Sequence, residues 1–136
     1  MVFDQNVLEI DVPSETGRIC DFINEQVGDM KRYGAVIGMS GGIDSAVTVA
    51  LCVKALGTEK VLGLILPERE SDRVSVKYAM KHAAKLGIKT VTVDITPVLE
   101  VMGTYRRRDE FIRNVFPEYT PRYKSKITLP ADLLSR

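Results

Sequence analysis

Gly38-Met39-Ser40-Gly41-Gly42-Ile43-Asp44-Ser45 connects a predicted strand to a predicted helix. It follows residues 35–37, an apolar run typical of a buried strand, and precedes residues 46–56, whose composition is typical of a helix. A strand that enters a Gly-Gly turn and opens a helix presents unpaired N–H groups and the positive end of the helix dipole to an anion. Glycines also let phosphate oxygens approach the backbone closely. The stretch therefore predicts a phosphate-binding loop.

An acidic residue distinguishes this loop from the lysine-containing phosphate loop G-x-x-x-x-G-K-[ST], because Asp44 follows the glycines and no lysine does. A carboxylate beside phosphates is repulsive unless a cation lies between them, so Asp44 predicts a Mg²⁺ ion. The alternative interpretation of the same residues is a tight strand–helix turn in which Ser40 caps the helix.

The order of patterns along the chain predicts the fold class. We expect helices over residues 13–30, 46–56, 74–86, 96–101 and 109–116, and strands over residues 35–39, 61–66 and 90–94. A further helix is expected to begin at residues 131–135, after a loop over residues 117–129. Alternating strands and helices predict an α/β protein with a doubly wound parallel sheet, whose ligand binds at the carboxyl ends of the strands.

Composition limits the classes of protein. With 136 residues, 45% hydrophobic and 27% charged, we expect a single domain over residues 1–136. Residues 1–12 would form an N-terminal extension, and residues 117–136 a loop and an incomplete C-terminal element. No apolar stretch approaches the roughly 18–20 residues of a membrane span, so we expect a cytoplasmic protein without a membrane partner. A net charge of +1 argues against nucleic acid as a partner.

Several single residues are expected to be structural. Cys20 and Cys52 lie among apolar residues of predicted helices, which indicates buried, reduced thiols. We interpret His82 as a histidine at the solvent edge of its helix rather than a catalytic base. The methionines at positions 30, 39, 80 and 102 are expected to fill gaps in the core. Residues 105–136 hold eight Lys and Arg against four Asp and Glu, which we interpret as a solvated surface.

The loop resembles a known family. Ser-Gly-Gly-Ile-Asp-Ser, residues 40–45, is similar to the pyrophosphate-binding loop of the N-type ATP pyrophosphatases. Residues 61–69, Val-Leu-Gly-Leu-Ile-Leu-Pro-Glu-Arg, and residues 94–97, Asp-Ile-Thr-Pro, resemble ammonia-dependent NAD synthetases among them. The resemblance implies an adenine nucleotide alpha hydrolase-like, Rossmann-like sheet. It covers nearly all of this chain but about the first half of the family's catalytic domain, so we expect a sheet incomplete at the C-terminus with residues 35–39 as its bare edge.

The resemblance also implies an activity. Such a ligase adenylates the carboxylate of deamido-NAD with ATP, releases pyrophosphate, and then forms the amide of NAD with ammonia. ATP and Mg²⁺ are the implied cofactors, Asp44 is the implied metal ligand, and a homo-oligomer, in the form of a homodimer, is expected. No catalytic residue is assigned, because this chemistry needs no protein nucleophile. The implied ATP-binding residues are Gly38, Met39, Ser40, Gly41, Gly42, Ile43, Asp44, Ser45, Leu66 and Arg69.

Alternatives stay open at two of these residues and for the activity. Leu66 would offer backbone groups to adenine, and a side chain in the core at a strand end is compatible with this role, because only the backbone would be used. Arg69 could contact nucleotide or be an exposed loop charge. The same loop serves other amide ligases and sulfurtransferases, so a different acceptor is the second hypothesis. A non-catalytic nucleotide-binding module that uses the bare strand edge as an interface is the third.

Overall fold

The computed structural model describes residues 9–120, 122 and 123, and the chain divides into two compact units, Met1–Ile95 and Thr96–Arg136. Each unit is described by itself. The helix predicted from residue 131 and most of the loop predicted over residues 117–129 lie outside the described residues.

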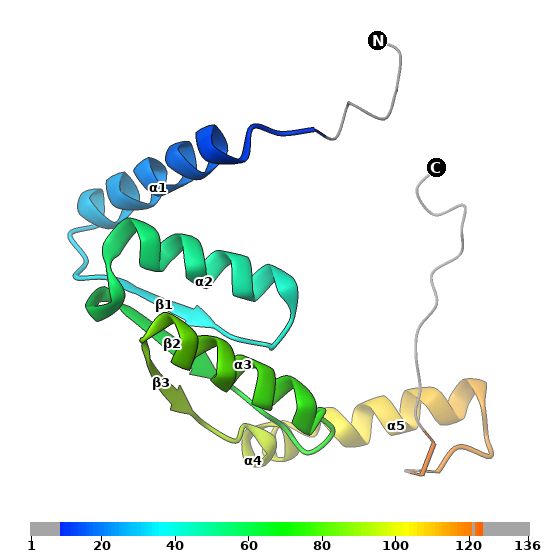
Figure 1. The fold of residues 1–136 in the computed structure, drawn as a ribbon. Helices are drawn as coiled ribbons and strands as arrows, with labels where there is room; N and C mark the ends of the chain where they lie inside the picture. Colours follow the sequence, from blue (N-terminus) through cyan, green and yellow to red (C-terminus); the bar gives the residue numbers. More distant parts are fainter. Residues whose placement is uncertain (1–8, 121, 124–136) are drawn as a thin grey trace. The chain divides into compact units, whose positions relative to one another are not determined.

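The first unit contains a parallel sheet of three strands in the order β1-β2-β3 (Figure 1). The strands are β1 (Ala35–Gly38), β2 (Val61–Ile65) and β3 (Lys89–Thr92). Ala35 lies opposite Val61, and Leu62 lies opposite Lys89. The predicted parallel α/β architecture is therefore confirmed. β1 is an edge of this sheet, as expected, and the Val36 side chain on it is 63% exposed.

The helices of this unit are α1 (Val12–Asp29), α2 (Ile43–Leu56) and α3 (Arg73–Leu86), with a short 3₁₀ turn, η2 (Thr58–Lys60), before β2. Side chains fix two of their starts. The carboxylate of Asp11 accepts a hydrogen bond from the Ser14 amide, and that of Asp72 accepts one from the Val74 amide. Gly87 ends α3 in the left-handed region, with φ of 70°. These boundaries lie within a few residues of the predicted ones.

The core of the first unit lies between the sheet and helices α2 and α3. Its buried residues come from every layer and are Met39, Val49, Cys52, Val61, Ile65, Ala79, Ala83 and Ile88.

Both cysteines are buried free thiols, as the sequence predicts. Cys20 on α1 lies with its Sγ 3.8 Å from the carbonyl oxygen of Leu51 on α2, and this contact helps to pack α1 against α2. Burial, and secondarily the nearby Cys20, raises the pKa of the Cys52 thiol.

The prediction for the methionines was right for one and wrong for three. Met39 is 4% exposed, whereas Met30, Met80 and Met102 are 50–60% exposed. Helical geometry explains Met80: its neighbour Ala79 points at the sheet, and each residue turns about 100° around the helix, which carries Met80 to the outer surface. Apolar character alone did not reveal which face each methionine occupies.

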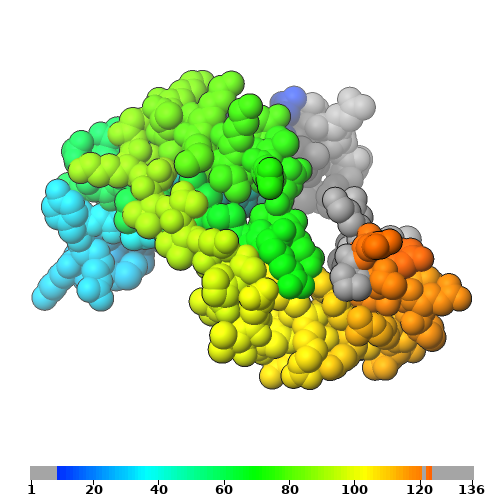
Figure 2. Space-filling model, turned by 90° about the horizontal axis from the view of Figure 1, so that it is seen from below, coloured from blue at the N-terminus to red at the C-terminus, as the bar shows by residue number. Residues whose placement is uncertain are grey.

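The second unit contains α4 (Thr96–Val101) and α5 (Thr104–Val115), separated by Gly103 at φ of 70°. Residues of this unit run from yellow to orange in Figure 2. α4 has the predicted bounds, but α5 begins five residues before the predicted start at 109. The arginines at 106–108 continue the helix instead of preceding it, because arginine is a good helix former. Among the described residues, no helix is both long and apolar enough to cross a membrane.

Candidate functional site

The loop between β1 and α2 is held against α3 by a close approach of two backbones. Gly41 has φ of +81°, and a Cβ placed on it would lie 2.2 Å from the carbonyl oxygen of Ser75. Only glycine allows both the left-handed backbone and this approach. Gly42 differs, because a Cβ there would meet nothing closer than the Ser40 Oγ at 3.4 Å. Gly41 is therefore required for packing against α3, whereas the backbone at Gly42 is open to a ligand.

Two serines close the loop with a connected set of hydrogen bonds. The Ser45 hydroxyl donates to the carbonyl oxygen of Gly42 at 3.0 Å. Its Oγ accepts from the Ser40 amide at 3.3 Å and lies 3.2 Å from the Ser40 Oγ. Each hydroxyl has one proton, so the Ser40 hydroxyl donates in the contact between the two oxygens. The Ser40 Oγ in turn accepts from the Gly42 amide at 3.3 Å. The loop is thus preorganised by its own side chains.

The first turn of α2 is left open to a ligand. The residue that caps this helix is Gly42, which has no side chain to bond the first-turn amides. The alternative in which Ser40 caps the helix is wrong, because the Ser40 Oγ accepts from the amide of the cap residue itself. The N–H groups of Ile43, Asp44 and Ser45 have no intrahelical acceptor, since they belong to the first turn. The 14-residue helix also places the positive end of its dipole there.

Asp44 stands in this first turn with an exposed side chain. Its carboxylate makes no ion pair or side-chain hydrogen bond with any residue that the structure describes. Mg²⁺ is commonly held by one or two carboxylates together with substrate phosphates. A single uncommitted carboxylate beside an anion-binding helix end fits that mode. The described residues contain no group of three or more His, Cys, Asp or Glu side chains that could hold a metal by themselves.

A cavity of about 140 Å³ joins this loop to the end of β2. Ser40 of the loop, Leu66 after β2 and Ser75 of α3 are among its lining residues. Leu66 is 44% exposed, so its alternative as a core residue is wrong. The volume is below the roughly 300–1,000 Å³ of sites for whole small molecules, and it suits one part of a nucleotide.

A larger cavity, of about 410 Å³, lies between α2 and α3. The loop contributes Gly41, Gly42 and Ser45, and α3 contributes Lys81, His82 and Lys85. His82 is half-buried, with its Nε2 3.2 Å from the carbonyl oxygen of Ala46 in the first turn of α2. Partial exposure agrees with the predicted position of His82 at the solvent edge of its helix, and the contact with Ala46 is an addition that the structure reveals. Local sequence holds no signal for this contact, because it joins residues 36 positions apart.

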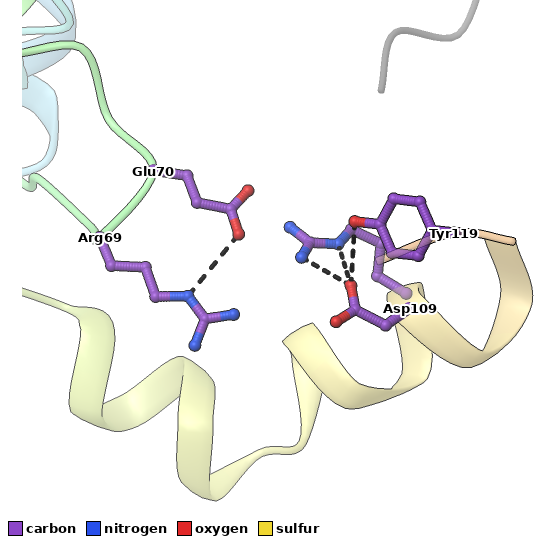
Figure 3. A network of polar contacts seen from close by, with 5 residues as sticks. Arg69, Glu70, Asp109 and Tyr119 are labelled. Atoms are coloured by element: carbon purple, nitrogen blue, oxygen red, sulfur yellow. Dashed lines mark hydrogen bonds and ion pairs between the residues drawn. The ribbon is translucent and has the colours of Figure 1, made fainter. Parts of the chain in front are cut away.

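Arg69 is not among the residues that line either cavity. Its guanidinium Nε lies 3.6 Å from a carboxylate oxygen of Glu70, and both side chains are more than 40% exposed (Figure 3). The structure brings Met39, Ser40 and Leu66 into one cavity and does not bring Arg69 to it.

The fold and the loop together define the class. A parallel α/β sheet with a glycine-rich loop at the carboxyl end of β1 is the architecture of a nucleotide-binding domain. The first-turn aspartate and the absence of a loop lysine fit the ATP pyrophosphatases, which residues 40–45 resemble in sequence.

Comparison with known proteins places the chain within that class. The family model described as NAD synthase matches residues 15–127. The chain belongs to the NAD synthase family. An NH(3)-dependent NAD(+) synthetase of Mesorhizobium japonicum is 44% identical over 124 residues, which cover 90% of this chain and 39% of the relative.

Solved structures agree with this assignment. An NH3-dependent NAD synthetase from Campylobacter jejuni has a TM-score of 0.66 and 33% identity, over 71% of this chain and 42% of its own. An NMN synthetase from Francisella tularensis has the same TM-score with 27% identity, over 74% of this chain and 41% of its own. The chain thus spans about two fifths of the length of the relatives that it matches.

Proposed function

We propose that this chain is the ATP-binding part of an ammonia-dependent NAD synthetase. Membership of the NAD synthase family supports the proposal. The single observation that carries it is the open first turn of α2, with an uncommitted Asp44 beside it. An anion held there is contacted by backbone N–H groups, and the carboxylate makes a metal ion necessary.

ATP would lie along the carboxyl ends of β1 and β2. Its phosphates would contact the amides of residues 43–45, which have no acceptor within the helix. The hydroxyls of Ser40 and Ser45 would contact the phosphates after giving up the hydrogen bonds that they donate within the loop. The adenine would enter the smaller cavity, where the backbone of Leu66 supplies polar groups at the exposed end of β2. Gly38 and Met39 would contribute as the strand end from which the loop rises. Arg69 would contact the nucleotide only after leaving Glu70, because the two side chains are paired in this structure.

The metal would be held by Asp44 and by the phosphates themselves. When bound, Mg²⁺ neutralises the charge that accumulates on phosphate oxygens. Asp44 is suited to this position because it extends from the first turn of the helix whose amides contact the same phosphates. Neither of the two cavities is lined by an acidic residue, so Asp44 would reach the metal from beside the larger one, where its chain neighbours Ile43 and Ser45 form part of the wall.

The reaction would proceed in two steps. The carboxylate of deamido-NAD attacks the α-phosphorus of ATP and displaces pyrophosphate, which gives an acyl adenylate. Ammonia then attacks the acyl carbon and displaces AMP, which gives the amide. The leaving group of the first step develops negative charge on the outer phosphates. The α2 amides and the Ser40 and Ser45 hydroxyls stabilise that charge without forming a covalent bond.

The test measures pyrophosphate release from ATP and Mg²⁺ with deamido-NAD and ammonia, and separately the binding of ATP by calorimetry. The exchange Asp44→Asn is expected to weaken magnesium-dependent ATP binding at least about tenfold, since a charged ligand to the ion is lost. Asp21→Asn on α1 is the matched control, because it removes an exposed carboxylate far from the loop in sequence. Equal affinity of the Asp44 variant and the original chain would refute the metal assignment.

A second candidate is an adenylating ligase with another acceptor. The structural similarity to an NMN synthetase favours it, since that protein is named for a different product. Pyrophosphate release with nicotinate mononucleotide but not with deamido-NAD would identify this candidate. ATP binding without pyrophosphate release for any acceptor would indicate a binding module that completes its site with further polypeptide.

We also infer a cytoplasmic homo-oligomer. The exposed edge strand β1 supports association, because unpaired strand edges bind other chains. Light scattering that gives the mass of a single chain at all concentrations tested would refute the oligomer.

A further inference from the structure

One wall of the larger cavity is formed by α3 and not by the loop that would bind phosphate. One side is formed by the loop and the first turn of α2, including Gly42 and Ser45, and the opposite side by the second half of α3. Lys81 and Lys85 stand on that second side. They are four residues apart on one helix, so they project from the same face about 6 Å from each other.

The charge of this cavity is not compensated. Two lysines line it, and none of its lining residues is acidic. Neither lysine forms an ion pair within the part of the chain that the structure describes. The positive end of α2 faces the same space, since Gly42 and Ile43 also line it. Uncompensated positive charge from two helices in one concave space attracts a polyvalent anion.

His82 joins the two walls. Its Nε2 lies 3.2 Å from the carbonyl oxygen of Ala46, one turn into α2. The close approach of Gly41 to the Ser75 backbone is a second contact between the same elements. These two contacts fix the distance between the loop and α3, so the lysines are held opposite the loop amides.

We propose that Lys81 and Lys85 of α3 bind the outer phosphates of the nucleotide, and then the pyrophosphate that adenylation releases, across the cavity from the loop. This inference rests on the proposed function for the identity of the anion. The loop amides contact the phosphate chain from α2, and the lysine ammonium groups contact it from α3.

The test compares binding of inorganic pyrophosphate, of ATP with Mg²⁺, and of AMP by calorimetry of the 136-residue chain. Exposed charge pairs contribute up to about fivefold each in affinity. The double variant Lys81→Ala/Lys85→Ala is therefore expected to bind pyrophosphate and ATP more weakly, by up to about 25-fold. AMP lacks the outer phosphates, so its affinity is expected to stay within about twofold. The effect on pyrophosphate should decrease as salt is raised.

Two further variants sharpen the result. Lys81→Arg/Lys85→Arg keeps both charges and is expected to keep most of the affinity for pyrophosphate. Lys54→Ala removes an exposed lysine from the last turn of α2, about 16 Å along the helix from its start, and is expected to change nothing. Alanine is the best helix former, so circular dichroism of all variants should match that of the original chain.

Unchanged pyrophosphate affinity in the double alanine variant would overturn the inference, and so would an equal loss for AMP. If the double variant fails to weaken pyrophosphate while the original chain still binds ATP with Mg²⁺, the proposed function stands and this inference falls. If the original chain binds neither pyrophosphate nor ATP, both are refuted together.

Discussion

Exchange of the two adjacent loop glycines tests whether α3 supports the phosphate loop. Gly41→Ala places a methyl group 2.2 Å from the Ser75 carbonyl oxygen and forces alanine into φ of +81°. Gly42→Ala meets only the Ser40 Oγ at 3.4 Å, in a backbone conformation that alanine adopts readily. The two variants add the same methyl group to neighbouring residues, so each serves as the control for the other.

The expected loss of stability follows from these contacts. The left-handed backbone costs alanine about 1–2 kcal/mol. The clash adds to this, because a backbone oxygen cannot move aside as the end of a flexible side chain can. We expect Gly41→Ala to lower the free energy of unfolding by about 2 kcal/mol or more, which corresponds to a fall in Tm of about 8–16 °C for a unit of this size. Gly42→Ala should cost at most about 1 kcal/mol, the penalty of alanine at a helix cap.

Thermal unfolding by circular dichroism measures stability, and calorimetry with ATP and Mg²⁺ measures binding. Gly41→Ala should lower both the Tm and the affinity for ATP, because the loop is displaced from α3. Gly42→Ala should keep most of its stability but lose binding, since its methyl group stands where phosphate oxygens approach. A Gly41→Ala protein with a Tm within about 2 °C of the original and full ATP affinity would show that contact with α3 does not support the loop.

Three further predictions concern the core and the second unit. Gly63→Ala should destabilise the first unit by about 1–3 kcal/mol, measured by urea unfolding, because its Cβ would lie 2.6 Å from the Met39 sulfur; unchanged stability would contradict the packing. The Cys52 thiol, whose pKa is raised by burial, should react with a thiol reagent only after denaturant is added, and fast labelling of the folded protein would contradict its burial. Asp109→Asn should cost up to about 1 kcal/mol above about pH 4, because the hydrogen bond from Arg108 lowers the pKa of this carboxyl. That stabilisation is present above the pKa of the unfolded chain and is lost as pH falls through the lower folded value, so the two proteins should converge in acid. A difference that persists in acid would contradict the assignment.

The site of the Asp109 prediction is shown in Figure 3. The carboxylate of Asp109 accepts hydrogen bonds from Arg108 at 2.7 Å and from the Tyr119 hydroxyl at 3.3 Å. A double-variant comparison with Arg108→Ala would separate the contribution of the pair from that of the tyrosine.

The sequence predicts the helices and strands that have a regular apolar pattern and a glycine or proline at their ends. Gly57 and Gly87 end their helices where expected, and the apolar runs of β1 and β2 are strands. The start of α5 could not be predicted, because three consecutive arginines, Arg106–Arg108, are equally compatible with a charged loop and with a helix.

The loop half of the candidate site could be predicted, and the α3 half could not. Gly41, Gly42 and Asp44 lie within one short motif of the chain, and their chemistry is visible there. Lys81, His82 and Lys85 reach the same cavity only because α3 packs beside α2, which local sequence does not show. The hydrogen bond between His82 and Ala46 joins residues 36 positions apart and depends on that packing.

The most direct measurement of the central claim is an amide NMR titration of the chain with ATP and Mg²⁺. We expect the largest shifts on the N–H groups of residues 42–45, a smaller shift at Leu66, and loop shifts in Asp44→Asn that need a much higher nucleotide concentration. Shifts confined to other segments, with the loop amides unchanged at saturating nucleotide, would contradict the claim that phosphates bind at the start of α2.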